Sequence, residues 1–258
     1  MASQQDIARR ILPLLDLTSL NDTDTDSDIL RLCTRAGTPV GAVAAVCVAP
    51  AFVAVARQGL ARARLQDKIK VATVVNFPSG EGELEEVVEE ARSAITSGAD
   101  EIDLVFPYRA LMAGDERTGY RLISRCRQTL TGYTLKVILE TGELKDPALI
   151  RTASEIAISA GADFLKTSTG KVKINATPDA AAIMMQAIHD STRPVGFKAA
   201  GGIRTTAEAA LYVDLAAEIL GQSWLRPERF RFGASGLLDD LLGTLGLGAK
   251  LVDLSSRY

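Results

Sequence analysis

Short apolar runs alternate with longer amphipathic segments along the whole chain. The runs are rich in β-branched and apolar residues and are bounded by turn residues, as is typical of buried strands. They lie at Leu14–Leu17, Gly41–Val48, Ile69–Asn76, Glu101–Phe106, Thr134–Glu140, Ala162–Lys166, Val195–Lys198 and Phe230–Gly233. Between them lie segments with helical periodicity, such as Glu83–Thr96, Pro147–Ser159 and Pro178–His189.

This order of elements predicts an α/β fold, a (β/α)8 TIM barrel with an extra N-terminal helix. No Pro- or Ser-rich linker divides the sequence, so we interpret residues 1–258 as one domain. A doubly wound open sheet is the structural alternative. The end of the chain, residues 249–258, is too short for another barrel element and is expected to be mobile.

One segment, Val40–Ala56, is almost free of polar groups and resembles a membrane span. It is short for that role and is broken by Pro50, so a buried strand followed by a helix is the better interpretation. We therefore expect no membrane association.

Composition and charge argue against several classes of function. The 258 residues carry a net charge of −3 and no polybasic stripe, which argues against a nucleic-acid partner. Cys33, Cys47 and Cys126 are isolated thiols, which favours a reducing compartment over a disulfide framework or a cysteine-rich zinc site. The first residues, Met1–Arg10, show no secretory signal, so a cytoplasmic location is expected.

No metal or other cofactor is expected. His189 is the only histidine, so it cannot be one of several histidine ligands. Asp22, Asp24 and Asp26 open like a calcium-binding loop, but Ser27 stands where that loop needs glycine. This acidic run is better explained as the charged start of a helix.

Charged residues interrupt several of the predicted strands. Side chains alternate between the two faces of a strand, so Asp103, Lys136, Lys166 and Lys198 all fall on faces that could line the barrel interior. Lys166 and Lys198 end their predicted strands, at the mouth where barrel enzymes carry out their chemistry. Strand-end lysines usually just reach solvent, but two on neighbouring strands with an acid nearby favour a reactive site.

Two lysines at this spacing favour a neutral amine. Neighbouring strands lie roughly 5 Å apart, and two ammonium groups ~4 Å apart repel by about 4 kcal/mol at an effective dielectric of ~20. One lysine should then lose its proton near neutral pH. A neutral amine attacks a carbonyl to form a Schiff base, which lets a neighbouring C–C bond break without a metal.

The loops after the last three strands favour a phosphate site. Gly170 and Lys171 follow the sixth strand, Gly201, Gly202 and Arg204 the seventh, and Gly233 and Ser235 the eighth. Loops at these positions, with an adjoining helix N-terminus, commonly bind phosphate in barrels. Neither a Walker A sequence nor GxGxxG is present, which disfavours nucleotide binding by those routes.

The sequence resembles the deoxyribose-phosphate aldolase family over nearly its whole length. The most specific matches are Lys166-Thr167-Ser168-Thr169-Gly170 and Lys198-Ala199-Ala200-Gly201-Gly202; others are Leu15-Asp16-Leu17-Thr18, Asn76-Phe77-Pro78, the run Asp103–Leu111 and Glu140-Thr141-Gly142-Glu143-Leu144. Two residues depart from the family pattern: Ala199 stands where proline is frequent, and Gly236 stands where a second serine is frequent.

The resemblance implies a class I aldolase that reversibly cleaves 2-deoxy-D-ribose 5-phosphate to acetaldehyde and D-glyceraldehyde 3-phosphate. It implies Lys166 as the Schiff-base residue, Lys198 as the group that perturbs it, and Asp103 as a proton shuttle. It also suggests that the C-terminal tyrosine, Tyr258, folds over the mouth and relays a proton. The partners expected are phosphorylated sugars and aldehydes, with a homodimer as the candidate assembly.

Two other functions stay open at this point. One is a Schiff-base aldolase of the same fold that acts on a ketose phosphate. The other is a barrel that binds a sugar phosphate without turnover, as a sensor or scaffold. The presence of Lys166, Lys198 and Asp103 together argues against the second.

Overall fold

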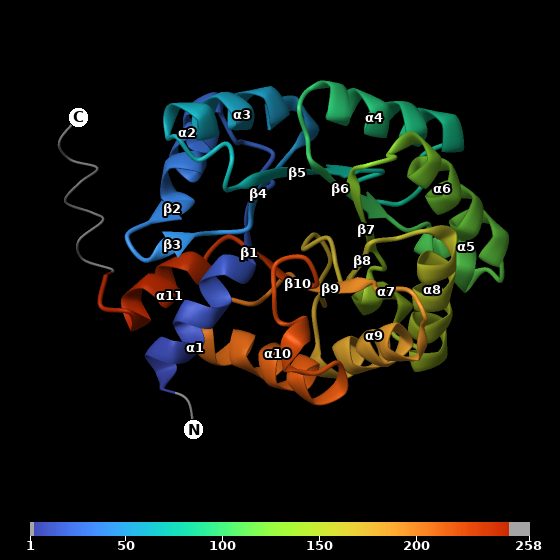
Figure 1. Cartoon of the computed structure of the whole chain (residues 1–258). Coiled ribbons are helices and arrows are strands. Elements are labelled where there is room, and N and C mark those ends of the chain that lie inside the picture. Colours follow the sequence, from blue (N-terminus) through green and yellow to red (C-terminus); the bar gives the residue numbers. More distant parts are fainter. Residues whose placement is uncertain (1–2, 248–258) are drawn as a thin grey trace.

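The computed structural model describes residues 3–247 and shows a closed barrel of eight parallel strands (Figure 1). Around the barrel the order is β1, β10, β9, β8, β7, β6, β5, β4, and β4 pairs with β1 to close it. The strands are β1 (Leu15–Ser19), β4 (Ala45–Val48), β5 (Lys70–Val75), β6 (Glu101–Val105), β7 (Thr134–Ile138), β8 (Phe164–Lys166), β9 (Gly196–Ala200) and β10 (Phe230–Ala234). The predicted (β/α)8 barrel is confirmed, and the open sheet is excluded.

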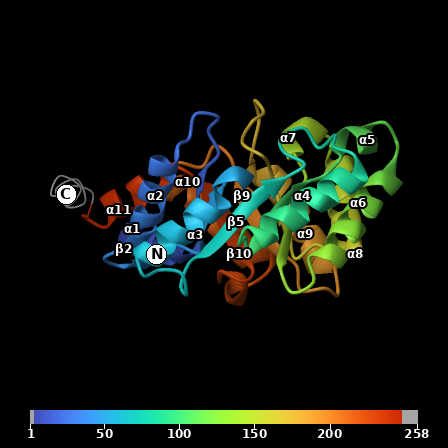
Figure 2. The same cartoon turned by 90° about the horizontal axis from the view of Figure 1, so that it is seen from above.

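Helices surround the barrel on its outside, as both views show (Figures 1 and 2). They are α2 (Asp26–Arg35), α3 (Val53–Arg62), α4 (Leu84–Thr96), α5 (Tyr108–Met112), α6 (Glu116–Thr129), α7 (Thr141–Leu144), α8 (Pro147–Ala160), α9 (Pro178–Asp190), α10 (Thr206–Ile219) and α11 (Leu237–Thr244), with short 3-10 turns at Leu12–Leu14, Pro50–Phe52 and Gln222–Trp224. The main apolar core lies between these helices and the outward side chains of the strands.

The extra N-terminal helix is α1 (Gln4–Ile11), which packs against α10 and α11. Ser3 Oγ accepts from the Asp6 N–H, and the Asp6 carboxylate accepts from the Ser3 N–H, so both sides of a capping box are present. Ala8 and Ile11, on the inner face of the helix, are fully buried. The helix thus covers one side of the barrel before the chain enters β1.

The segment Gly41–Val48 is divided rather than one strand, so that prediction is wrong. Its first part, β3 (Gly41–Ala42), forms an antiparallel hairpin with β2 (Gly37–Thr38), and only Ala45–Val48 joins the barrel. The Val43 N–H donates to Ala36 O at 3.0 Å, which turns this part of the chain away from the barrel. The rest of the apolar run continues into α3 as a buried strand followed by a helix.

The prediction that Lys198 ends its strand is also wrong. Strand β9 continues to Ala200, so Lys198 lies in the middle of the strand and is fully buried. Lys166 is the last residue of β8, as predicted. The two lysines are direct partners in the β8–β9 register.

The predicted C-terminal tail and Tyr258 lie outside the described residues. Within residues 3–247, no helix is long and apolar enough to cross a membrane.

Candidate active site

A cluster of buried charges occupies the interior of the barrel. Asp103 from β6, Lys136 from β7, Lys166 from β8 and Lys198 from β9 all point inward, as the strand alternation predicted. None of these four side chains is more than 3% exposed. Buried lysines and carboxylates are rare unless they are paired, and here each one is.

Asp103 connects the three lysines. Its Oδ2 accepts hydrogen bonds from Lys166 Nζ at 2.7 Å and from Lys198 Nζ at 2.8 Å. Its Oδ1 accepts from Lys136 Nζ at 2.7 Å. The structure therefore brings the predicted catalytic trio Lys166, Lys198 and Asp103 into direct contact.

Below the trio, three further charged residues extend the network toward the floor of the barrel. Asp16 accepts from Lys198 Nζ through Oδ2 and from Arg231 through Oδ1, each at 2.5 Å. Glu101 accepts from Arg231 Nη2 at 2.9 Å and pairs with Lys136 at 2.7 Å. These contacts close one continuous network of seven buried side chains.

The sequence interpretation gave no role to Asp16 or Arg231. Each is a single charge between two apolar neighbours, Leu15 and Leu17 for Asp16, and Phe230 and Phe232 for Arg231. This is the same signal that singled out Asp103 and the lysines, so a uniform application of it would have found both residues.

The buried environment shifts the pKa of each amine. Burial is the largest cause and lowers the pKa of Lys166; Asp103 opposes it, and the Lys198 ammonium adds to it. Burial also acts to lower the pKa of Lys198, but Asp103 and Asp16 outweigh it and raise that pKa. Lys166 is thus the amine that gives up its proton more easily. The direction agrees with the sequence argument, but the main cause is burial rather than the like charge.

The carboxylate at the centre stays ionised. Burial alone raises the pKa of Asp103, but the ammonium groups around it outweigh that effect and hold the pKa well below its usual range. Asp103 can therefore accept a proton only when one of its cationic neighbours changes its own charge.

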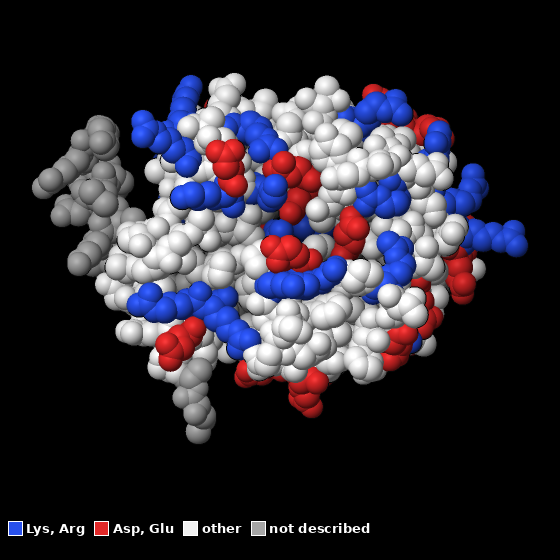
Figure 3. Space-filling view, viewed as in Figure 1, with Lys and Arg blue, Asp and Glu red and all other residues white. Residues whose placement is uncertain are grey.

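Lys166 opens into a cavity of about 580 Å³ at the C-terminal mouth of the barrel. The same cavity is lined by every residue predicted for phosphate binding: Gly170, Lys171, Gly201, Gly202, Arg204, Gly233 and Ser235. The end of β1 and the two residues after it, Thr18–Asn21, also line it and were not predicted. Figure 3 shows this face hollowed near its centre, with charged side chains gathered around the hollow.

Glycines shape the part of the cavity opposite Lys166. Gly201 and Gly202 both have left-handed backbones, with φ of 85° and 86°, which residues with a Cβ rarely adopt. A Cβ at Gly233 would lie 3.0 Å from Lys198 Cε, so this glycine leaves room for the lysine stem. Helix α11 begins directly after Ser235 and Gly236, and no side chain caps its N-terminus. Such an end favours an anion.

A residue at the end of the neighbouring strand, β7, holds the loop after β8 in place. Glu140, which follows β7, is fully buried and accepts from Thr169 N at 3.2 Å and from Thr169 Oγ1 at 2.5 Å. The Lys171 N–H in turn donates to Thr169 Oγ1 at 3.0 Å. The end of β7 thus fixes the position of the loop that carries Gly170 and Lys171.

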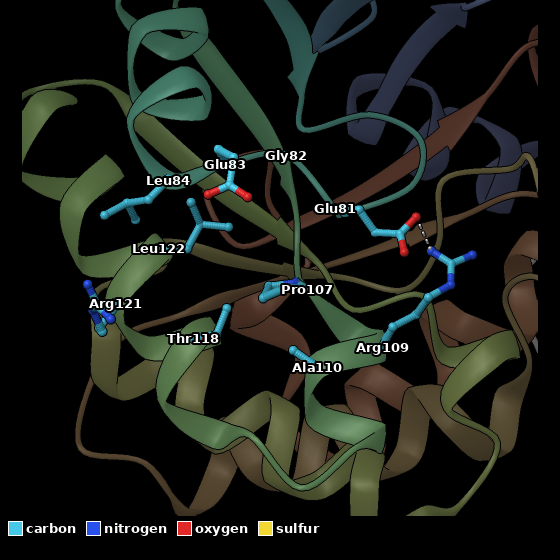
Figure 4. Close-up of a pocket in the computed structure, with 11 residues that line it drawn as sticks. Glu81, Gly82, Glu83, Leu84, Pro107, Arg109, Ala110, Thr118, Arg121 and Leu122 are labelled. Atoms are coloured by element: carbon cyan, nitrogen blue, oxygen red, sulfur yellow. Dashed lines mark ion pairs between the residues drawn. The ribbon is translucent and has the colours of Figure 1, made fainter.

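A second hollow, of about 500 Å³, lies between the loop before α4 and helix α6 (Figure 4). Arg109 and Glu81 form an ion pair of 3.2 Å at its edge. None of the predicted site residues lines it. Among the described residues, no group of three or more His, Cys, Asp and Glu is arranged to hold a metal ion.

The comparison with known proteins agrees with this architecture. Residues 10–242 match the sequence profile of the DeoC/LacD family aldolases. The chain belongs to this aldolase family. A solved structure of a putative deoxyribose-phosphate aldolase from Toxoplasma gondii ME49 is 30% identical, with a TM-score of 0.88; the match covers 94% of this chain and 95% of that one.

Two further structures resemble this aldolase. A putative deoxyribose-phosphate aldolase from Coccidioides immitis is 29% identical over 96% of this chain and 87% of that one, with a TM-score of 0.78. A deoxyribose phosphate aldolase from Aeropyrum pernix, described as a tetramer, is 26% identical over 95% of this chain and 93% of that one, with a TM-score of 0.72. Family membership makes this chain a carbon–carbon lyase.

The two departures from the family pattern lie in well-defined places in this aldolase. Ala199 is fully buried and continues β9 in regular pairing with Phe232. Gly236 lines the cavity, and a Cβ there would meet no atom within 4 Å. A serine would fit at position 236, so its absence removes a hydroxyl from the cavity without changing the backbone.

Proposed function

We propose that this aldolase reversibly cleaves 2-deoxy-D-ribose 5-phosphate to acetaldehyde and D-glyceraldehyde 3-phosphate through a Schiff base on Lys166. The observation that carries the proposal is the single cavity that joins the Lys166 amine to three loops suited to a phosphate. Lys166 ends β8, while the loops leave β8, β9 and β10. A sugar phosphate in this cavity has its carbonyl end at the amine and its phosphate at the loops.

The first step is attack of the neutral Lys166 amine on the aldehyde carbon, C1, of the open-chain sugar. Loss of water gives a protonated imine, which withdraws electrons from C2. Removal of the proton on the C3 hydroxyl then lets the C2–C3 bond break. Its electron pair moves into the enamine, and C3 leaves as the aldehyde carbon of glyceraldehyde 3-phosphate.

The second half returns the enzyme to its starting state. The enamine takes a proton at C2, and hydrolysis of the imine releases acetaldehyde and the free amine. Asp103 is fully buried and contacts both lysines, so we assign it the proton shuttle, acting through a bridging water. Lys198 keeps its charge and disfavours protonation of Lys166.

The phosphate is assigned to the loops by charge and by backbone. Lys171 and Arg204 are exposed cations at the cavity rim, and Gly201, Gly202 and Gly233 let the backbone approach a ligand closely. Gly170 and Ser235 complete the set. We assign Tyr258, which lies outside the described residues, a proton relay to C2.

The cellular compartment that we propose for the enzyme follows from the state of its thiols. Cys33, Cys47 and Cys126 are free and buried, which suits a reducing compartment such as the cytoplasm. The homodimer stays a prediction, and light scattering on purified protein measures it.

The test is product analysis with two substrates. We expect 2-deoxyribose 5-phosphate to yield acetaldehyde and glyceraldehyde 3-phosphate in equal amounts, and a Lys166→Met variant to yield neither. Cleavage of a ketose phosphate in place of deoxyribose phosphate would favour the other Schiff-base aldolase. A chain that binds the sugar phosphate without any turnover would be a sensor or scaffold.

A further inference from the structure

The buried network holds unequal numbers of positive and negative groups. Its cations are Lys136, Lys166, Lys198 and Arg231, and its anions are Asp16, Glu101 and Asp103. None of the seven side chains is more than 6% exposed. With every group ionised, this network of seven side chains holds four positive charges and three negative ones.

An unbalanced buried charge is costly, because water cannot solvate it. The network becomes neutral when one cation gives up its proton. Arg231 cannot be that cation, since a guanidinium stays charged in proteins. Arg231 therefore acts as a fixed positive charge, and the excess falls on one of the three lysines.

The contacts decide which lysine carries the excess. Lys136 pairs with Glu101 and Asp103, each at 2.7 Å, and lies 3.8 Å from Asp16. Lys198 pairs with Asp16 at 2.5 Å and Asp103 at 2.8 Å.

Lys166 has a single carboxylate partner among these anions, Asp103 at 2.7 Å, and shares that oxygen with Lys198. It is the least compensated of the three amines and the one that lines the cavity. Its lowered pKa, against the raised pKa of Lys136 and of Lys198, runs in the same direction.

Two other titratable groups face Lys166. Cys47 on β4 is fully buried, and burial raises the pKa of its thiol, so it adds no charge near neutral pH. Glu140 follows β7 and is also fully buried. Burial raises the pKa of its carboxyl although Lys166 acts to lower it, and both of its oxygens bond Thr169 rather than an amine. Neither group replaces the missing partner of Lys166.

We propose that Arg231 and Glu101, at the floor of the barrel and away from the cavity, are positioning residues that set the protonation of Lys166 through the charge balance of the network. Arg231 binds Asp16 Oδ1 and both oxygens of Glu101. It orients Asp16 so that Oδ2 faces Lys198, and its positive charge neutralises much of the negative charge at the floor of the barrel. The reactive amine is thus controlled by groups that never touch a substrate.

The charge balance of the network also affects the steps that follow the reaction of the Lys166 amine. A protonated imine restores the fourth positive charge, and cleavage of the C–C bond removes it as the enamine forms. The network therefore favours the enamine. This part of the inference rests on the proposed Schiff-base function, whereas the protonation of Lys166 does not.

The test changes the floor charge in both directions in the full-length chain. Glu101→Gln removes an anion and should move the titration of Lys166 to lower pH. Arg231→Gln removes a cation and should move it to higher pH. Each shift should be about one pH unit, the size of a unit charge acting over roughly 10 Å at an effective dielectric of ~20. The double variant restores the balance and should return close to the parent, and Arg231→Lys keeps the charge and should keep the parent titration.

The readout is the rate at which a trace acylating reagent modifies Lys166, followed against pH by peptide mass mapping. Only the neutral amine reacts, so the profile reports its protonation without any aldolase chemistry. Acetaldehyde trapping by borohydride runs in parallel. Opposite shifts that cancel in the double variant are the expected result.

Two results would overturn the inference: single variants that shift in the same direction, or profiles that overlay the parent. If Arg231→Gln does not fold by circular dichroism, Glu101→Gln must still shift to lower pH, and a parent-like profile then rejects the proposal. Labelling that shifts as expected while the parent forms no imine would reject the proposed function and keep the charge balance.

Discussion

Lys166 and Lys198 lie directly opposite each other on β8 and β9, and both amines donate to Asp103 Oδ2. One carboxylate oxygen cannot compensate two ammonium groups fully. Lys198 has a second carboxylate partner in Asp16, so Lys166 is the amine whose positive charge is less fully compensated. The register of two neighbouring strands thus leaves Lys198 the better compensated of the two amines, in line with its raised pKa and the lowered pKa of Lys166.

Removing Lys198 should raise the pKa of Lys166. Lys198→Met takes one cation from the network and leaves Asp103 to Lys136 and Lys166. We expect imine formation near neutral pH to fall at least about tenfold, since one pKa unit is a factor of ten in free amine. Part of it should return as the pH rises. Lys173→Met, at an exposed loop position, is the control.

The measurement is borohydride trapping of acetaldehyde as a function of pH. If the Lys198→Met and parent profiles coincide, the positive charge of Lys198 has no part in activating Lys166.

Replacing Asp103 should separate imine formation from the later steps. Asp103→Asn removes the carboxylate that favours the charged form of Lys166, so the amine should stay reactive. The proton transfers to and from the sugar should slow by about a hundredfold or more, the usual size of general acid–base catalysis. Trapping of acetaldehyde and turnover of the sugar phosphate are compared in the same preparation. Loss of trapping in this variant would contradict the shuttle role.

The barrel was predictable because each strand is an apolar run between turn residues. The exception, Gly41–Val48, has the same appearance, but its first residues pair with Gly37–Thr38 in a hairpin. Pairing between neighbouring segments is a tertiary choice that the pattern of this run does not reveal.

The site was predictable where a charge interrupts an apolar strand, as at Asp103 and Lys166. What the sequence could not supply is which oxygen each amine shares, and how deeply each is buried. Those facts make burial the largest cause of the lowered pKa of Lys166. Lys198 was expected at a strand end, and only the continuation of β9 to Ala200 shows that it is enclosed.

The loop after β10 gives a prediction for the phosphate. Ser235 is exposed at the cavity, so Ser235→Asp places a carboxylate beside the proposed phosphate. Repulsion of about 1 kcal/mol per charge pair in water should weaken binding of deoxyribose phosphate roughly tenfold. Unphosphorylated deoxyribose should be nearly unaffected, and Ser93→Asp on the exposed face of α4 is the control. If the substitution changes the Michaelis constants of both sugars by the same factor, the phosphate does not bind at this loop.

Tyr258, outside the described residues, gives a prediction on proton transfer. Tyr258→Phe removes the phenol proton and should lower turnover far more than it raises the Michaelis constant. Imine trapping on Lys166 should be unchanged. Proton exchange at the methyl group of bound acetaldehyde is the measurement, and exchange as fast as in the parent would leave Tyr258 without a catalytic role.

The lowered pKa of Lys166 also predicts how stability depends on pH. Between that pKa and the ordinary value of 10.5, the unfolded chain holds the Lys166 proton and the folded chain does not. The free energy of unfolding therefore increases as the pH rises across this window. The stability that Lys166 contributes is lost as the pH falls through its folded pKa. Lys166→Met lacks this dependence.

Urea unfolding of both chains between about pH 6 and about pH 10 measures the effect. The parent should gain stability relative to Lys166→Met as the pH rises. A constant difference across the range would mean that folding leaves the pKa of Lys166 unchanged.

The most direct test of the account is the identity of the residue that carries the imine. The full-length chain is incubated with acetaldehyde, reduced with borohydride and digested, and the peptides are mapped by mass spectrometry. We predict a single reduced adduct on Lys166, with Lys136 and Lys198 unmodified. An adduct on another lysine, or none at all, would contradict the Schiff-base mechanism at Lys166.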